Sequence, residues 1–340
     1  MAQREIIIAT FAIIGPIGLF INTIIIWTLF KSRLYRTRNY LIYASLALCD
    51  GFYASFGCLF GICIYVVGEF SFCKGVLVAT VLAYTTSVAV VAFLSYDRYL
   101  VLRRPLRYPR IMTRRFTIIV IIIIWAVSFL NAGLLLSRQA ILPITDHIST
   151  LNRKNCVLTR IVVREYLIAW SLLLIILPML TTIFMNIAIL RLATSHYKTL
   201  HKATASFRCT PNREWNIKAA FTTVRIVTTN VLCTLPFVCV ILVEALCSYC
   251  VPYKTMRPFY ALFLLNFAST IVNPLVYTIT NQELKRKVNQ TLRTISPLFI
   301  KRCLATTVEN QSNLSMMASR RSITELATFD DRDNKLRLSK

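Results

Sequence analysis

The chain has 340 residues, of which 56% are hydrophobic and only 16% charged, and its mean hydropathy is +0.61. Such an apolar composition argues against an ordinary soluble domain. The formal net charge of +25 would indicate a nucleic-acid partner if the chain were soluble.

Seven apolar stretches divide the chain, and each is long enough to cross a hydrocarbon core about 30 Å thick, which takes about 20 helical residues. In chain order they are Ile6–Phe30, Tyr40–Val67, Val76–Tyr96, Phe116–Leu136, Tyr166–Leu190, Ala219–Val243 and Phe259–Ile279. Because lipid offers backbone groups no hydrogen-bond partner, each stretch is predicted to be a helix. We therefore predict an all-α membrane protein, with a short extracellular N-terminus at residues 1–5 and a seven-transmembrane helix bundle at residues 6–280.

Lysine and arginine residues favour alternate links between these stretches. Of the 39, 29 lie in the links 31–38, 98–115 and 191–218 and in the tail 281–340. The positive-inside rule then predicts an extracellular N-terminus and a cytoplasmic C-terminus. The basic charge is interpreted as an orientation signal and as an attraction to anionic membrane lipid, and not as a nucleic-acid site.

The chain after the seventh stretch is predicted to leave the membrane. Residues 281–296 are expected to form a short amphipathic helix at the interface, the eighth helix. Four apolar residues fall on one of its faces: Leu284, Val288, Leu292 and Ile295. Residues 297–340 are polar and are predicted to be a disordered cytoplasmic tail.

Each stretch carries a distinctive motif. The third ends in Asp97-Arg98-Tyr99, and Cys73 lies 25 residues before Arg98, a separation of about one bilayer at about 1.5 Å per residue. The other helices carry, in chain order, Asn22, Leu46-Ala47-Leu48-Cys49-Asp50, Trp125, Pro178, Cys233-Thr234-Leu235-Pro236-Phe237 and Asn273-Pro274-Leu275-Val276-Tyr277. This ordered set resembles the motifs of rhodopsin-like (class A) G-protein-coupled receptors.

The resemblance implies a receptor in the plasma membrane that binds an extracellular ligand, activates a heterotrimeric G protein and is not an enzyme. Four residues would take part in G-protein coupling: Asp97, Arg98, Tyr99 and Tyr277. Arrestin and kinases would act on the tail. The alternative is a seven-helix transporter or a chemosensory protein that does not act through G proteins, although a transporter would carry more intramembrane charges or internal repeats.

Five of the eleven cysteines are candidates for a specific role. The resemblance implies a disulfide between Cys73 and Cys156, both on the oxidising outer side. Cys247 and Cys250 also face outward and are predicted either to form a small disulfide or to stay free thiols. Cys303 follows a basic stretch on the inner side and is a candidate for palmitoylation.

Asp50 lies near the middle of the membrane, where an acidic residue costs about 2.5–3.5 kcal/mol on insertion scales and marks a functional site. The resemblance places Asn22, Ser87, Ser269 and Asn273 around it and implies a sodium ion in the inactive state. Oxygen ligands suit such a cation. The alternative is a neutral aspartic acid that only fixes helix packing. No other metal and no cofactor is expected.

The resemblance also places the ligand in an aromatic lining. Its residues are Thr80, Tyr84, Phe237, Phe259, Phe263 and Phe267. Thr80 stands where amine receptors carry aspartate, and Phe267 stands where opsins carry lysine, so neither a biogenic amine nor retinal is expected. A peptide and a small apolar molecule both remain candidates, and the peptide is preferred.

Three positions depart from the family pattern. Thr234, Asn230 and Asn186 stand where the family usually has tryptophan, phenylalanine and tyrosine respectively. The resemblance places them in the relay that couples ligand binding to helix motion. The departures suggest a divergent orphan member, of an invertebrate or chemosensory type, with a modified relay.

Overall fold

The computed structural model describes residues 2–63, 70–137, 162–203, 211–247 and 256–294. The chain divides into two units, Met1–Val288 and Asn289–Lys340. The second unit lies largely outside the described residues. The larger unit contains every helix that was predicted to cross the membrane.

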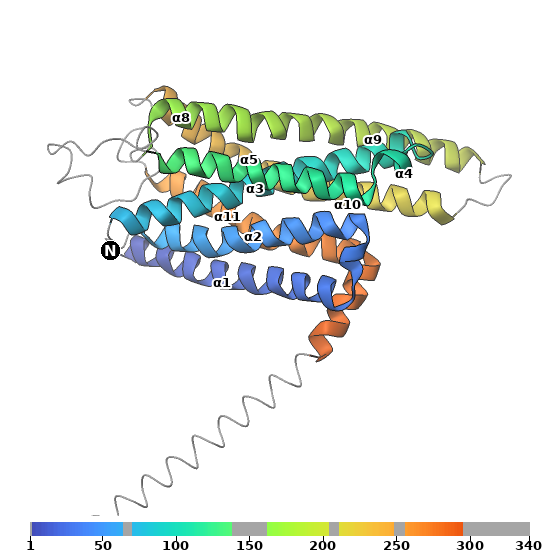
Figure 1. Cartoon of the computed structure of the whole chain (residues 1–340), viewed down its shortest axis with the longest axis horizontal. Helices are drawn as coiled ribbons and strands as arrows, with labels where there is room; N and C mark the ends of the chain where they lie inside the picture. The colour runs from blue at the N-terminus through green and yellow to red at the C-terminus, as the bar shows by residue number, and fades with distance from the viewer. Residues whose placement is uncertain (1, 64–69, 138–161, 204–210, 248–255, 295–340) are drawn as a thin grey trace, which may run out of the picture. The chain divides into compact units, whose positions relative to one another are not determined.

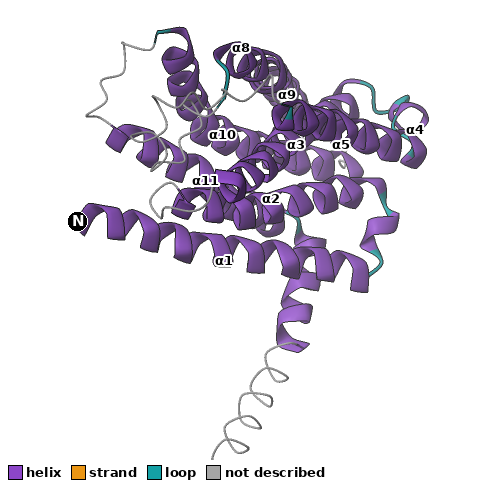
Figure 2. Ribbon diagram, turned by 60° about the vertical axis from the view of Figure 1, so that its left-hand side comes forward, coloured by secondary structure: helices purple, strands orange, loops and turns teal. Residues whose placement is uncertain are grey.

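The regular elements of the described ranges are helices (Figures 1 and 2). Six membrane helices are continuous: α1 (Ala2–Lys31), α2 (Arg38–Cys63), α3 (Phe70–Arg103), α5 (Arg114–Leu136), α10 (Pro211–Leu246) and α11 (Met256–Thr280). The remaining one is built from α8 (Arg164–Ala169), the π-helix η2 (Trp170–Ile176) and α9 (Leu177–Ala203). In the part of the chain that the structure describes, seven helices are long and apolar enough to span a membrane, which confirms the predicted fold class.

Most of the helices extend beyond the apolar stretches that predicted them. The helix α3 begins six residues before Val76 and ends seven residues after Tyr96. Hydropathy marks the part of a helix that lies in lipid, whereas the backbone can stay helical in the headgroup region, where charged side chains are solvated. At the start of α5, by contrast, a cap fixes the boundary, because the Thr113 side chain accepts a hydrogen bond from the Phe116 amide.

Proline shapes the fifth membrane helix. Pro178 has no N–H and therefore cannot make the helical hydrogen bond to the carbonyl four residues earlier. The π-helical turn η2 ends two residues before it, and π-turns of this kind often occur at functional sites. Pro236 and Pro274 stand inside α10 and α11.

The helices differ in how deeply they are packed. In the apolar, membrane-spanning part of α3, 78% of the residues are buried, whereas in the corresponding part of α5 only 22% are buried. The helix α3 packs against α2, α5, α9 and α10, and α1 lies beside α2 (Figure 1). The helix α3 therefore runs through the packed interior of the bundle and contacts helices on several sides.

Two short elements follow α1 and α3: η1 (Leu34–Arg36) and α4 (Tyr108–Ile111). Residues 282–294 are also helical, close to the predicted eighth helix. Leu284 and Val288 are buried in the core of the larger unit. Leu292 belongs to the second unit, and Ile295 lies outside the described residues.

Candidate functional site

The C-terminal end of α3, which is its predicted inner end, holds a buried ion pair. Arg98 is 5% exposed and Asp97 is 1% exposed, and Arg98 Nε lies 3.5 Å from Asp97 Oδ2. Neither of these two atoms makes a hydrogen bond to another described residue. The two charges therefore neutralise each other while part of their bonding capacity stays unused.

Tyr108 of α4 and Arg38 at the start of α2 add to this pair, and the sequence analysis did not single them out. The Tyr108 hydroxyl of α4 donates a 2.7 Å hydrogen bond to Asp97 Oδ1. The Arg38 guanidinium stacks on the Tyr108 ring at 4.1 Å and donates to the Met112 carbonyl. Burial, reinforced by the Asp97 carboxylate, raises the pKa of Tyr108, so the phenol keeps its proton and remains a donor. Asp97, Arg98, Tyr108 and Arg38 are called the inner cluster below.

Within the described ranges, the other two predicted coupling residues make no hydrogen bond to the inner cluster. Tyr277 is buried and stacks on Tyr43, with ring centroids 5.0 Å apart. Its hydroxyl has no hydrogen-bond partner within the described ranges. Tyr99 instead bonds to Arg103 and packs with a separate small core group. The structure therefore groups Asp97 and Arg98 closely and leaves Tyr99 apart from them.

The predicted polar cluster forms around Asp50. Ser87 donates to Asp50 Oδ1 at 2.7 Å, and the Asn273 amide donates to Asp50 Oδ2 at 3.2 Å. Asn22 instead joins α1 to α11, because its amide donates to the Gly18 and Thr270 carbonyls, each at 2.9 Å.

Two oxygens near this cluster remain unused. The side-chain carbonyls of Asn22 and Asn273 are buried and have no hydrogen-bond partner among the residues described. Ser269 is buried on α11, one turn before Asn273, but no hydrogen bond joins it to Asp50 in the described part of the chain. Carboxylate, hydroxyl and amide oxygens that lack partners are the ligand types that a hard cation prefers.

The predicted aromatic lining also comes together. The rings of Phe237 and Phe263 lie 5.4 Å apart, those of Phe263 and Phe267 lie 6.4 Å apart, and Tyr84 meets Phe237 edge to face at 6.5 Å. The remaining two predicted residues contribute less. The Thr80 hydroxyl donates to the Val76 carbonyl of its own helix, and the Phe259 side chain lies outside the described part of the structure.

Further aromatic residues in this cluster were not predicted. Phe11 of α1 is fully buried and packs on Phe263 and Phe267, with ring distances of 5.2 and 5.3 Å. Phe60 of α2 packs edge to face on Phe263. A phenylalanine in an apolar helix gives no signal of its own, because which face points inward depends on the packing of neighbouring helices.

A neutral hydrogen-bonded quartet shares Tyr84 with the aromatic lining, and the sequence analysis did not predict it. Asn266 of α11 accepts a 2.6 Å hydrogen bond from Tyr53 of α2. Its amide donates to Thr234 of α10 at 3.2 Å and to Tyr84 of α3 at 3.4 Å. These four residues are called the mid-bundle quartet below. Thr234 is one of the three positions predicted to depart from the family pattern, so the quartet contains a residue of the predicted relay.

The two other departures are buried too. The Asn186 amide donates to Ser95 of α3 at 3.2 Å and to the Thr182 carbonyl of its own helix at 2.7 Å. This bond ties the fifth membrane helix to α3 a little above Asp97. Asn230 is buried in α10.

Several predicted sites fall outside the described residues. Cys156, Cys250, Cys303 and the tail 297–340 are among them, and so is the side chain of Cys73, whose backbone belongs to α3. Cys247 is bonded in a disulfide, but its partner is not described, so pairing with Cys250 remains a prediction.

Comparison with known proteins identifies the class of protein. The sequence matches the family described as 7 transmembrane receptor (rhodopsin family) over residues 21–277. Dopamine receptor 1 of Drosophila melanogaster is 26% identical over 312 residues, which cover 81% of this chain and 60% of that receptor. Cannabinoid receptor 1 of Taricha granulosa is 24% identical over 315 residues, which cover 84% of this chain and 62% of that receptor.

A third relative covers less of the chain. The glucose-dependent insulinotropic receptor of Rattus norvegicus is 25% identical over 207 residues, or 59% of this chain and 42% of that receptor. The chain thus spans less than two thirds of the length of each of these relatives. The low identities fit the divergence that was predicted. The chain belongs to the rhodopsin family of seven-transmembrane receptors, which are receptors and not enzymes.

Proposed function

We propose that this receptor binds an extracellular ligand beside the aromatic lining and activates a heterotrimeric G protein through Arg98. The observation that carries the proposal is the buried Asp97–Arg98 pair at the inner end of α3. Its 3.5 Å ion pair leaves Arg98 Nε without a hydrogen bond. A buried charge that is only partly bonded gains free energy from a better partner, and a docked G protein would supply one.

The surface next to this pair supports protein docking. Leu106, in the link between α3 and α4, is 93% exposed. Its exposed neighbours Arg103, Arg104 and Arg107 are all basic. A large apolar side chain inside a charged rim resembles the anchor of a protein interface. We infer that Leu106 inserts into an apolar pocket on the G protein while the arginines face acidic groups around it.

For the ligand, the described contacts favour a small, largely apolar molecule over a peptide. The predicted lining is continuous with Phe11 and Phe60, so the outer half of the bundle is densely aromatic. Dopamine receptor 1 is named for an amine, but an ammonium group would need a carboxylate at the position of Thr80. The Thr80 hydroxyl is instead bonded to its own helix. This contact supports a ligand without a positive charge.

We also propose that a sodium ion binds at Asp50. The unpartnered oxygens of Asn22 and Asn273 support this idea, because they complement the Asp50 carboxylate and the Ser87 hydroxyl. The ion would supply a positive charge that allows Asp50 to stay ionised inside the membrane. The protein itself holds the ligands in place through the Asn22 bonds between α1 and α11.

For localisation, we place this multi-pass protein in the plasma membrane. The N-terminus would lie outside and the tail inside, an orientation supported by the asymmetry of basic residues between links.

The function is tested by nucleotide exchange on a panel of purified heterotrimeric G proteins. The receptor is reconstituted as the Asp97→Asn variant, which we expect to signal without ligand. Adding Leu106→Ala should lower the exchange rate about tenfold, since a buried interface leucine contributes on the order of 1–2 kcal/mol. Leu130→Ala, which truncates a 74% exposed leucine on α5, is the matched control and should change nothing. Absence of exchange with every G protein would contradict the proposal.

A further inference from the structure

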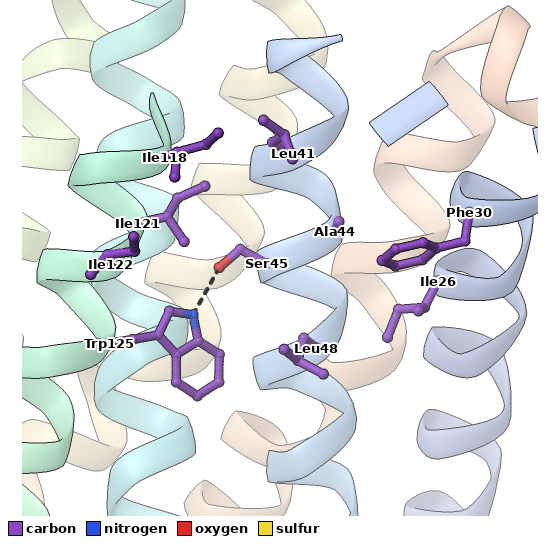
Figure 3. Close-up of a pocket in the computed structure, with 10 residues that line it drawn as sticks. All are labelled: Ile26, Phe30, Leu41, Ala44, Ser45, Leu48, Ile118, Ile121, Ile122 and Trp125. Atoms are coloured by element: carbon purple, nitrogen blue, oxygen red, sulfur yellow. Dashed lines mark hydrogen bonds between the residues drawn. The ribbon is translucent and has the colours of Figure 1, made fainter. Parts of the chain in front are cut away.

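A groove on the surface of the bundle is lined by α1, α2 and α5 (Figure 3). Its volume is about 290 Å³. The small residues Ala44 and Ser45 of α2 line its middle, between Phe30 of α1 and Trp125 of α5. Phe30 is 56% exposed. Because all three helices span the membrane, the groove opens to lipid.

The interior of the groove is almost entirely apolar. Its single polar contact is internal: the Trp125 indole donates a 3.2 Å hydrogen bond to Ser45 Oγ (Figure 3). The other lining residues are aliphatic or aromatic. The groove is therefore suited to a hydrocarbon chain and leaves few polar atoms free to fix a polar group inside it.

A cation stands at the inner end of each lining helix. On α5, Arg114 precedes the lining residue Ile118 by four positions, so the two share a helix face. On α2, Arg38 precedes the lining residue Leu41 by three positions. Arg33 lies in the turn that follows α1, and its amide donates a hydrogen bond to the carbonyl of Phe30.

Two of these cations are brought close by a contact. The Arg38 guanidinium donates to the carbonyl of Met112, which lies two residues before Arg114 in the chain. Arg33 and Arg114 are exposed and Arg38 is partly so. The one salt bridge among the described residues joins Asp97 to Arg98, so none of these three arginines is paired with a carboxylate there.

The general excess of basic residues on the cytosolic side does not account for this arrangement. The orientation of the protein in the membrane would be set equally well by arginines at the inner end of any helix. Here the three helices that share one groove each place an arginine about one turn beyond its lining. A guanidinium group matches a phosphate in shape and charge.

We propose that the groove binds an anionic phospholipid of the inner leaflet, with one acyl chain along α2 and the phosphate among Arg33, Arg38 and Arg114. The apolar lining would hold the chain, and the arginines would select the headgroup. A neutral sterol would satisfy the lining but leave the arginines without an anion.

The lipid would also be connected to the inner cluster. Arg38 stacks on Tyr108, and Tyr108 holds Asp97. A phosphate that binds the Arg38 guanidinium would therefore change the position of Tyr108, and through Tyr108 that of Asp97, the residue that restrains Arg98. This consequence rests on the proposed function, whereas binding of the lipid does not.

The test uses the full-length receptor in phosphatidylcholine vesicles with a trace of phosphatidylserine that carries a photoactivatable diazirine in its acyl chain. After illumination, the labelled peptides are identified by mass spectrometry. We expect the label on the segments of α2 and α5 around Ser45 and Trp125. Unlabelled phosphatidylserine should displace it, and extra phosphatidylcholine should not.

Two pairs of arginine variants distinguish binding at the groove from a general effect of positive charge. Arg33→Gln combined with Arg114→Gln should lower labelling about fivefold for each arginine removed, as expected for a basic residue at an anionic membrane surface. The control, Arg191→Gln with Arg225→Gln, removes two exposed cations from α9 and α10, which do not line the groove. It should label like the unmodified receptor.

A second variant tests the acyl-chain site without changing charge. Ala44→Phe fills the middle of the groove and should abolish the label, whereas Ala126→Phe adds the same ring to the exposed surface of α5 and should not. The proposal is overturned if the control variants lose as much label as the test variants. It is also overturned if a phosphatidylcholine probe labels the groove equally, or if cholesterol displaces the phosphatidylserine probe.

Discussion

The inner cluster and the mid-bundle quartet are both buried, but they differ in how fully their polar atoms are bonded. In the inner cluster, two atoms of the charged pair lack a hydrogen bond. In the quartet, Asn266 uses its carbonyl and its amide on three partners from three other helices. A partly bonded charge can change partners at little cost, whereas breaking a fully bonded neutral network leaves several buried groups unpaired. The comparison suggests a switch at the inner end and a clamp in the middle.

The clamp includes Thr234, which the sequence analysis placed in a modified relay. A tryptophan at position 234 would fill space, whereas Thr234 instead adds a hydroxyl that Asn266 can reach. At this position the chain has a hydrogen bond between α10 and α11 in place of the bulky side chain that the resemblance implies. We expect this bond to resist the relative motion of those helices, so that ligand binding must first disturb the quartet.

The largest expected effect comes from removing the centre of the clamp. Asn266→Leu keeps the approximate volume but leaves Tyr53, Tyr84 and Thr234 without their shared partner. Unsatisfied buried groups cost about 1–3 kcal/mol each, and hydrogen bonds between membrane helices average about 0.6 kcal/mol, so we expect a loss of about 2–3 kcal/mol. The measurement is thermal unfolding in detergent. Leu265→Ala, on an exposed position of the same helix, is the control.

The Asn266→Leu variant can also contradict the distinction between the quartet and the inner cluster. If Asn266→Leu leaves the unfolding midpoint unchanged but raises ligand-independent nucleotide exchange strongly, the quartet is itself a switch. The distinction between a clamp in the middle and a switch at the inner end would then be wrong.

A smaller effect is expected when one bond of the inner cluster is removed. Tyr108→Phe deletes the hydrogen bond to Asp97 but keeps the ring on which Arg38 stacks. A single hydrogen bond to a charged group contributes about 1.5 kcal/mol, so ligand-independent exchange should rise by no more than about tenfold. Tyr108→Ala also removes the ring, and any further rise measures the stacking of Arg38. No rise in either variant would show that Asp97 is held without Tyr108.

The smallest effect concerns the polar cluster at Asp50. If sodium binds there, replacing choline chloride by sodium chloride should raise the unfolding midpoint, because a ligand that binds only the folded state stabilises it. At sodium concentrations near the dissociation constant, the gain is about 0.4 kcal/mol. Asp50→Asn should remove the sodium dependence. Equal shifts in both proteins would leave Asp50 as a packing residue only.

The sequence predicted the membrane helices and half of the inner cluster, for identifiable reasons. Helix number follows from apolar length, and Asp97 and Arg98 stand out because charges at the end of an apolar stretch are costly. Tyr108 and Arg38 were not predicted, because their contact depends on how the cytosolic link folds back onto α2. Their residue types are ordinary for a basic cytosolic link.

Asn266 is a different kind of omission. Like Asp50, it is a polar side chain in the middle of an apolar helix, and the same argument from cost would have marked it as important. Its partners could not have been named, however, because they come from α2, α3 and α10 and depend on the rotation of each helix. The resemblance drew attention to Thr234 as a departure but gave no sign of what it bonds.

The central claim is that Asp97 restrains Arg98 and that Arg98 carries the signal to the G protein. The most direct measurement is ligand-independent nucleotide exchange by four proteins at matched amounts: the unmodified receptor, Asp97→Asn, Arg98→Ala and the double variant. We predict a high rate for Asp97→Asn, and for both Arg98→Ala and the double variant the rate of the G protein alone. If the double variant is as active as Asp97→Asn, the signal does not pass through Arg98 and the account is contradicted.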